Sequence, residues 1–214
     1  MCIYKNYFKR IFDVVLSALA IMILSPVGLS VAVLVKIKLG SPVLFCQERP
    51  GKGEKFFRLY KFRTMTDKRD GNGGLLPDEA RLTGFGRILR TTSLDELPEL
   101  VNIFKGDMSI VGPRPLLVRY LPYYKEEERV RHSVRPGLTG LAQIKGRNNL
   151  GWDERLAMDR KYVENITLAN DLSIMLQTVG KVLKRSDIVS GEQLAMRDLD
   201  VERAWMQNGG SGDA

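Results

Sequence analysis

The pattern of apolar residues is strongest near the N-terminus, where residues 14–35 contain no charged side chain. A run of 22 such residues is long enough for a membrane-spanning helix, which needs about 20 apolar residues. Ser25 and Pro26 lie in the middle of the run, and proline removes a backbone hydrogen bond and bends or breaks a helix. The pattern therefore predicts a membrane segment with a break at Ser25–Pro26.

Basic residues flank this apolar run on both sides: Lys5, Lys9, Arg10, Lys36 and Lys38. A spanning helix usually carries its excess of positive charge on the cytoplasmic side alone. Two basic flanks favour a re-entrant helix–break–helix hairpin, whose two ends return to the same face of the membrane. A kinked spanning helix is the alternative, because spanning helices tolerate proline.

The remaining pattern predicts a small domain of helices with one short β-hairpin, so the fold class is α/β in the α+β sense. Residues 41–49 and 55–65 predict the two strands, joined by a turn at 50–53. Amphipathic helices are expected at 152–165 and 172–184. The second has an apolar face, which we expect to pack in the core rather than lie on a membrane: Leu172, Leu176, Val179 and Leu183.

This pattern divides the chain into three parts. A re-entrant membrane hairpin is expected at 1–40, a cytosolic domain that carries the chemistry at 41–190, and a polar C-terminal tail at 191–214. No internal repeat is visible.

The charge is concentrated beside the apolar segment. The chain carries a net charge of +8, with +9 in residues 1–69 and −1 in the remainder. Such a distribution suits an anionic membrane surface at least as well as nucleic acid. One histidine and two cysteines argue against a zinc site, so any metal would be a hard, oxygen-liganded ion such as Mg²⁺. His132 itself is expected on the surface of a charged helix.

An acidic pair, Asp95–Glu96, is the most informative feature for chemistry. In a structural interpretation, Ser93 and Glu96 form a capping box at a helix start, which Pro98 would place late. In a chemical interpretation, the pair attacks a phosphate or holds its metal. Arg114 follows between two prolines, and a guanidinium is suited to phosphate.

Two further basic loops accompany Arg114. Arg135 lies in Arg-Pro-Gly-Leu-Thr-Gly, where the glycines permit close backbone approach, and Arg147 lies in Lys-Gly-Arg-Asn-Asn. Each loop alone is weak evidence, but three rigid basic loops after an acidic pair favour phosphate chemistry. Neither phosphate-loop nor dinucleotide glycine motif is present.

At residues 9–188 the chain resembles the bacterial sugar transferases, in particular the small monotopic phosphoglycosyl transferases related to the initiating enzyme of bacterial N-linked glycan assembly. The resemblance rests on an ordered series of motifs: Ser25-Pro26, Gln47–Gly51, Tyr60–Met65, Ser93–Pro98, Gly106–Ser109, Gly112–Pro115 and Arg135–Gly140.

The resemblance implies transfer of a sugar 1-phosphate from a UDP-sugar to undecaprenyl phosphate, with release of UMP through a covalent aspartyl intermediate. Carried over, Asp95 is the nucleophile and Glu96 its partner in binding Mg²⁺. Asp171 matches a functional position that we assign to the metal. Lys61 and Arg90 also match functional positions, and we expect them to contact phosphate, as we do the arginines of the three basic loops: Arg114, Arg135 and Arg147.

The same resemblance implies a monotopic enzyme on the cytoplasmic face of the bacterial inner membrane, with membrane lipids as partners and no nucleic acid. Downstream glycosyltransferases would take its product, and a homodimer is left open. The segment 145–152 resembles members that use N-acetylated sugars. Two alternatives from other classes are a Mg²⁺-dependent phosphodiesterase that uses water, and a non-catalytic protein that binds lipid headgroups or nucleic acid.

Overall fold

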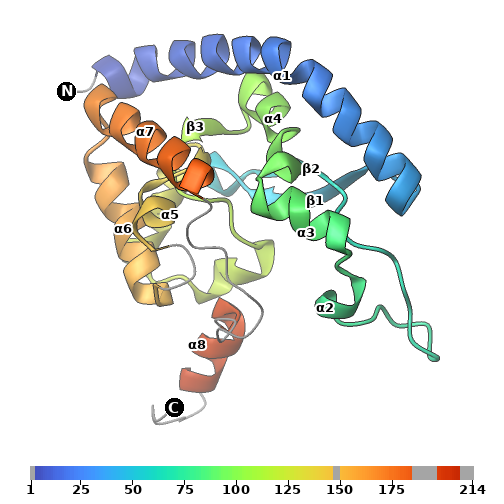
Figure 1. Ribbon diagram of the computed structural model, residues 1–214. Helices are drawn as coiled ribbons and strands as arrows, with labels where there is room; N and C mark the ends of the chain where they lie inside the picture. The colour runs from blue at the N-terminus through green and yellow to red at the C-terminus, as the bar shows by residue number, and fades with distance from the viewer. Residues whose placement is uncertain (1–2, 147–149, 185–196, 208–214) are drawn as a thin grey trace.

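The computed structural model describes residues 3–146, 150–184 and 197–207 (Figure 1). Its α-helices are α1 (Lys9–Leu39), α2 (Asp78–Arg81), α3 (Gly84–Thr91), α4 (Glu99–Lys105), α5 (Leu141–Lys145), α6 (Trp152–Glu164), α7 (Leu168–Lys184) and α8 (Leu199–Gln207). Its strands are β1 (Leu44–Pro50), β2 (Phe56–Phe62), β3 (Ser109–Val111) and β4 (Gly137–Thr139). Shorter helical turns are η1 (Tyr4–Phe8), η2 (Lys52–Glu54), η3 (Leu94–Glu96), η4 (Val118–Tyr123) and η5 (Glu126–Ser133).

Helix α1 covers one side of the molecule and bends partway along its length (Figure 1). It is one continuous helix through Pro26 and not two helices separated by a break. Pro26 has no N–H for the carbonyl of Met22, but the Ser25 hydroxyl donates to that oxygen at 2.9 Å. The Ser25 hydroxyl therefore gives that carbonyl a hydrogen-bond partner in place of the backbone N–H that Pro26 lacks. The return of α1 to one membrane face stays a prediction.

Helix α1 together with η1 is long and apolar enough to cross a membrane, and most of it is exposed. Its large apolar side chains include Met22, Ile23, Leu29 and Ile37, each between 65% and 73% exposed. An exposed apolar surface of this size marks an interaction site or a membrane contact.

The predicted β-hairpin is confirmed, since β1 and β2 pair antiparallel from Leu44↔Phe62 to Pro50↔Phe56. Asn102 of α4 joins this hairpin to the helix that follows the acidic pair. Its side chain is fully buried, accepts from the backbone N–H of Tyr60 at 3.1 Å and donates to the carbonyl of Arg58 at 2.7 Å. Both ends of one amide side chain thus fix the distance between β2 and α4.

A second, parallel pair of short strands brings two sequence motifs together, and the sequence pattern did not predict it. Strand β3 leads into Gly112, and β4 begins at Gly137. A Cβ at Gly137 would lie 2.1 Å from the Gly112 nitrogen, so no other residue fits. The close approach expected of these glycines is therefore real, and it sets Arg114 beside β4.

Helix α7 packs with the opposite face from the one expected. Ile174 is 3% exposed and packs with Val111 and Tyr162, whereas Leu176 and Val179 are 74% and 57% exposed. The prediction that the leucine face packs in the core is wrong for its described side chains. These apolar side chains are exposed instead, which fits the interfacial alternative.

The C-terminal segment contains α8, although its polar composition predicts a tail. Leu199 is fully buried against Tyr120 and Trp152. Arg203 donates to both carboxylate oxygens of Glu128 at 2.6 and 2.7 Å. A buried leucine and a bidentate ion pair are enough to dock a helix that looks polar overall.

Candidate active site

The acidic pair lies in η3, a single 3₁₀ turn between α3 and α4. The capping-box interpretation is wrong, because Ser93 has a left-handed backbone (φ 56°) and its side chain caps nothing. The turn is closed instead by the backbone, with the Glu96 N–H donating to the Ser93 carbonyl at 3.2 Å. Pro98 precedes the first residue of α4, as its preference for a helix start requires.

Glu96 accepts from two cations that come from distant segments. Lys61 Nζ of β2 and Arg114 Nη2 each lie 2.6 Å from Glu96 Oε1. Burial opposes ionisation here, but Arg114 and Lys61 lower the pKa of Glu96 to about 2. The side chain is therefore a carboxylate at any physiological pH.

Asp95 differs from its neighbour because no cation bonds it directly among the described residues. It is 8% exposed, and burial together with the charge of Glu96 raises the pKa of Asp95 to about 6. At neutral pH Asp95 is still mostly ionised, but it is more basic than an exposed aspartate. Two adjacent carboxylates with separated pKa values are typical of sites that divide nucleophilic and charge-holding roles.

Glu99 is a third carboxylate at this place, and the sequence analysis did not single it out. It is 2% exposed, and its Oε1 lies 3.1 Å from Lys61 Nζ. Burial and the charge of Glu96 raise the pKa of Glu99 to about 7. Lys61 therefore lies between two carboxylates and is held in place from both sides.

Arg131 fixes the backbone of Arg114, and the sequence analysis did not single it out either. Its fully buried guanidinium donates to the Arg114 carbonyl at 2.6 Å, to Asp159 at 3.0 Å and to the Tyr124 hydroxyl at 3.1 Å. A buried cation with three acceptors fixes the backbone to which it binds. No local motif marks Arg131, because its acceptors lie 7, 17 and 28 residues away.

A cavity of about 1470 Å³ is lined by Lys61, Asp95, Glu96, Arg114 and Arg131. Its basic residues outnumber its acidic ones among the described residues: Arg49, Lys61, Arg63, Arg81, Arg90, Arg114, Arg131, Arg155 and Lys181 against Asp67, Asp78, Asp95, Glu96 and Asp159. Apolar side chains from β1, β2, α5 and α7 form the remaining wall. A large, net-positive cavity with an apolar wall suits a phosphorylated ligand with an apolar part.

The other predicted phosphate-binding residues are separated by the fold. Arg90 of α3 lines the cavity and donates from Nε to the Thr64 hydroxyl at 3.1 Å. Arg135 is turned away from the cavity, and its Nε donates to the Gly106 carbonyl at the end of α4 at 2.8 Å. Arg147 lies outside the described residues.

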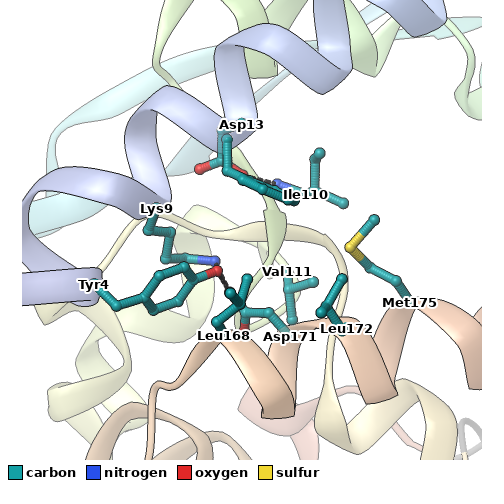
Figure 2. A pocket seen from close by; sticks show the side chains of 10 residues that line it. Tyr4, Lys9, Asp13, Ile110, Val111, Leu168, Asp171, Leu172 and Met175 are labelled. Carbon is teal, nitrogen blue, oxygen red and sulfur yellow. Dashed lines mark hydrogen bonds and ion pairs between the residues drawn. The ribbon is translucent and has the colours of Figure 1, made fainter. Parts of the chain in front are cut away.

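Asp171 lies in a separate cluster where the N-terminal segment meets α7 (Figure 2). Its Oδ2 accepts from the Tyr4 hydroxyl at 2.7 Å and from Lys9 Nζ at 2.6 Å, and its Oδ1 accepts from the Tyr162 hydroxyl at 2.8 Å. Nearby, Asp13 of α1 accepts from the backbone N–H of Ile110 at 2.9 Å. Both carboxylates thus fasten the membrane helix to the rest of the protein.

Asp95 and Glu96 lie together at the cavity, whereas Asp171 accepts from three side chains in a separate cluster, so the assignment of Asp171 to the metal stays a prediction. Mg²⁺ is commonly held by one or two carboxylates together with substrate phosphates and water, and Asp95 and Glu96 present two adjacent carboxylates to the cavity. Among the described residues no group of three or more acidic, histidine or cysteine side chains could hold a metal by itself. The donor set therefore fits an ion that arrives with a phosphorylated substrate.

His132 is not the surface residue that the sequence suggested. It is 6% exposed, with its ring 5.3 Å from that of Tyr124 and its Nδ1 3.2 Å from a Glu54 oxygen. Burial and the neighbouring Arg131 lower the pKa of His132 to about 4. It does not line the cavity and belongs to the packing of η5.

Sequence comparison relates this chain to known proteins. The sequence model of the bacterial sugar transferases matches residues 4–185. Sugar transferase EpsL of Bacillus subtilis (strain 168), described as uncharacterized, is 52% identical over 82% of this chain and 87% of the relative. The UDP-glucose:undecaprenyl-phosphate glucose-1-phosphate transferase of Caulobacter vibrioides is 41% identical over 82% of this chain and 69% of the relative.

The undecaprenyl-phosphate galactose phosphotransferase of Salmonella typhimurium is 38% identical over 85% of this chain, but this chain spans only 41% of that longer relative. In this chain, the matched region runs from η1 to the end of α7 and contains the acidic pair, its cationic partners and the cavity. The family suggested by the ordered motifs is confirmed: the chain belongs to the bacterial sugar transferase family.

Proposed function

We propose that this protein is a membrane-associated phosphoglycosyl transferase that moves a sugar 1-phosphate from a UDP-sugar to undecaprenyl phosphate and releases UMP. The observation that carries the proposal is the buried Asp95–Glu96 pair on the wall of a large, net-positive cavity. The names of the Caulobacter and Salmonella relatives, both undecaprenyl-phosphate sugar transferases, support the substrate class.

In the proposed first step, an Asp95 oxygen attacks the phosphorus atom that carries the sugar. The bond to the bridging oxygen of the diphosphate breaks, and UMP leaves with that oxygen. In the second step, a phosphate oxygen of the lipid attacks the same phosphorus atom and releases the Asp95 carboxylate. A covalent intermediate of this kind divides one difficult displacement into two easier ones.

The residues around Asp95 have separate roles in this proposal. Glu96, held ionised by Lys61 and Arg114, keeps negative charge beside Asp95 and maintains its basicity. Lys61, Arg90 and Arg114 offset the charge of the phosphates, which would otherwise repel an attacking carboxylate. Mg²⁺, bound by Asp95 and Glu96 together with the substrate, would supply further charge stabilisation at the diphosphate.

The exposed apolar surface supports a site at the membrane, where the lipid phosphate lies. We propose that α1 re-enters the inner membrane from its cytoplasmic face and that the exposed face of α7 lies in the interface. Single cysteines introduced at Lys5 and Lys38, in a chain whose native cysteines are replaced by serine, are expected to be labelled from the same side. Labelling from opposite sides would show that α1 spans the membrane.

Intact-protein mass spectrometry tests the covalent step. Enzyme in detergent is mixed with Mg²⁺ and a panel of UDP-sugars, without lipid acceptor. Wild type is expected to gain the mass of one sugar phosphate and Asp95→Asn is expected to gain none. Asp78→Asn, another acidic residue of the cavity wall, is the matched control and is expected to form the adduct.

The same assay distinguishes the competing functions and identifies the preferred donor sugar. Repeated turnover without lipid, seen as UMP released well beyond one equivalent per enzyme, would favour a phosphodiesterase, whereas no adduct and no UMP with any donor would favour a binding protein. Preference for N-acetylated donors in the panel is the expected result. Preference for glucose or galactose, the sugars in the names of the two characterised relatives, would overturn it.

A further inference from the structure

Arg49 and Arg155 line the same cavity as Arg114, and neither was assigned a role from the sequence. Arg49 lies near the end of β1, where its Nη1 contacts the Pro115 carbonyl at 3.4 Å and its Nη2 donates to the Gln47 side chain at 2.6 Å. Its Nε is buried without a hydrogen-bond partner among the described residues. A buried N–H left unpaired is costly, and such groups are often paired in the presence of a ligand.

Arg155 of α6 lines the same cavity, and the charge of Arg114 acts on it. Its guanidinium lies 4.8 Å from the ring of Trp152, and Trp152 is buried in the apolar cluster that contains Leu116. Trp152 is also fixed by its indole N–H, which donates to the Arg197 carbonyl at 2.8 Å. Stacking on an aromatic ring uses the face of a guanidinium and orients its N–H edge.

The three arginines form an excess of positive charge around the turn at residues 112–116. Glu96 is bonded by Lys61 and Arg114, and Asp159, whose charge also acts favourably on Arg155, is bonded by Arg131 at 2.9 Å. Burial and then the charge of Arg114 lower the pKa of Arg49 to about 10. Burial also lowers the pKa of Arg155, and Arg114 adds to this effect. An anion between these side chains would relieve their repulsion.

We propose that Arg49 and Arg155 join Arg114 in one anion site around the turn at 112–116, and that this site binds a phosphate group of a substrate. The identity of the substrate rests on the proposed function. The phosphate comes either from the diphosphate of the UDP-sugar or from the lipid acceptor, because both present phosphate oxygens that guanidinium groups bind.

Steady-state kinetics of Arg155→Gln and Arg49→Gln test the site. Each substitution is expected to raise the KM for one substrate by about tenfold or more, because a charge-assisted hydrogen bond to phosphate is lost. A higher KM for the UDP-sugar alone assigns the site to the donor, and a higher KM for undecaprenyl phosphate alone assigns it to the lipid. Values within twofold of wild type for both substrates would overturn the proposal.

Two controls remove the same charge, one from α6 and one from β2, the strand that pairs with β1. Arg160 lies on α6 with Arg155 but is exposed, and its ion pairs are long, at 3.7 and 3.9 Å. Arg58 lies on β2, opposite β1, and is exposed. Arg160→Gln and Arg58→Gln are expected to leave both KM values unchanged. If Arg155→Gln unfolds, Arg155→Lys keeps the charge and still loses the fork, so a severalfold rise in KM is expected.

A binding experiment keeps this inference separate from the proposed function. The chain has two tryptophans, so Trp205→Phe leaves Trp152 as the only tryptophan, which can be excited selectively at a wavelength that tyrosine does not absorb. Inorganic pyrophosphate or a short-chain polyprenyl phosphate is expected to change Trp152 fluorescence, and Arg155→Gln is expected to weaken that response about tenfold. A fluorescence response from a protein that shows no turnover of UDP-sugar and undecaprenyl phosphate would refute the proposed transferase function but retain the anion site. No response to either probe, or an equal response in Arg155→Gln, would overturn the site.

Discussion

Replacing Asp171 with asparagine is expected to loosen the attachment of α1 without changing the magnesium requirement. The carboxylate accepts from Tyr4, Lys9 and Tyr162, with all three distances between 2.6 and 2.8 Å. Asparagine keeps one acceptor oxygen but carries no charge, and its amide would face donors. Lys9 would then be left in a site where its side chain is only 12% exposed.

The magnitude follows from the burial of this pair. Removing one partner of a buried ion pair costs about 3–5 kcal/mol. The lower figure applies here, because Lys9 also interacts with the charge of Asp13 and because the introduced asparagine keeps one acceptor oxygen. About 3 kcal/mol corresponds to a fall in Tm of roughly 6–12 °C for a chain of this size.

Thermal unfolding in lipid nanodiscs measures the change in Tm of Asp171→Asn. A magnesium titration of activity measures its magnesium requirement. The half-saturating concentration of Mg²⁺ is expected to stay within twofold of wild type. Glu164→Gln, which removes an exposed carboxylate 3.9 Å from Arg160, is the control and should change Tm by little. In a double-mutant cycle, Lys9→Met and Asp171→Asn together should cost less than the sum of the two.

The opposite pattern would refute this reasoning. If Asp171→Asn raised the half-saturating concentration of Mg²⁺ tenfold or more while Tm stayed the same, Asp171 would be a metal ligand, as the family resemblance suggests. A loss of stability with an unchanged magnesium titration would assign Asp171 to the attachment of α1.

Three further predictions concern acid behaviour and packing. Because burial and Glu96 raise the pKa of Asp95 to about 6, the rate of adduct formation without lipid should fall tenfold per pH unit below about pH 6, as measured by rapid-quench mass spectrometry. The pKa of His132 is about 6.5 in the unfolded chain and about 4 in the folded protein, so the unfolded state binds the proton first as the pH is lowered. The free energy of unfolding should therefore fall by about 3 kcal/mol as the pH is lowered from 6.5 to 4. Urea unfolding of His132→Gln should lack this pH-dependent component. Gly137→Ala places a Cβ 2.1 Å from the Gly112 nitrogen and should prevent folding or cost several kcal/mol, whereas Gly151→Ala, with open space around it, should not, as circular dichroism would report.

Local signals in the sequence predicted the β-hairpin, helix α6 and the acidic pair, because each depends on residues close together in the chain. The environment of Asp171 could not be predicted in this way, since Tyr4 and Lys9 lie 167 and 162 residues away. The left-handed Ser93 was missed because its pattern with Glu96 also fits an ordinary cap. Helix α8 was missed because one buried leucine and one bidentate arginine give no periodic signal.

The attachment of α1 to α4 links the position of the site to the bilayer. Arg10 donates to the carbonyls of Ile103 and Phe104 at the end of α4, at 2.7 and 2.8 Å, and α4 begins next to the acidic pair. Because α1 and α4 are bonded in this way, any tilt or change of depth of α1 is expected to move α4 and Asp95 with it. With α1 in the membrane as proposed, the thickness of the membrane would set the height of Asp95, the proposed nucleophile, above the plane of the lipid phosphates. We therefore expect the acyl-chain length of the surrounding lipids to change the turnover rate, although no lipid tail needs to contact the site.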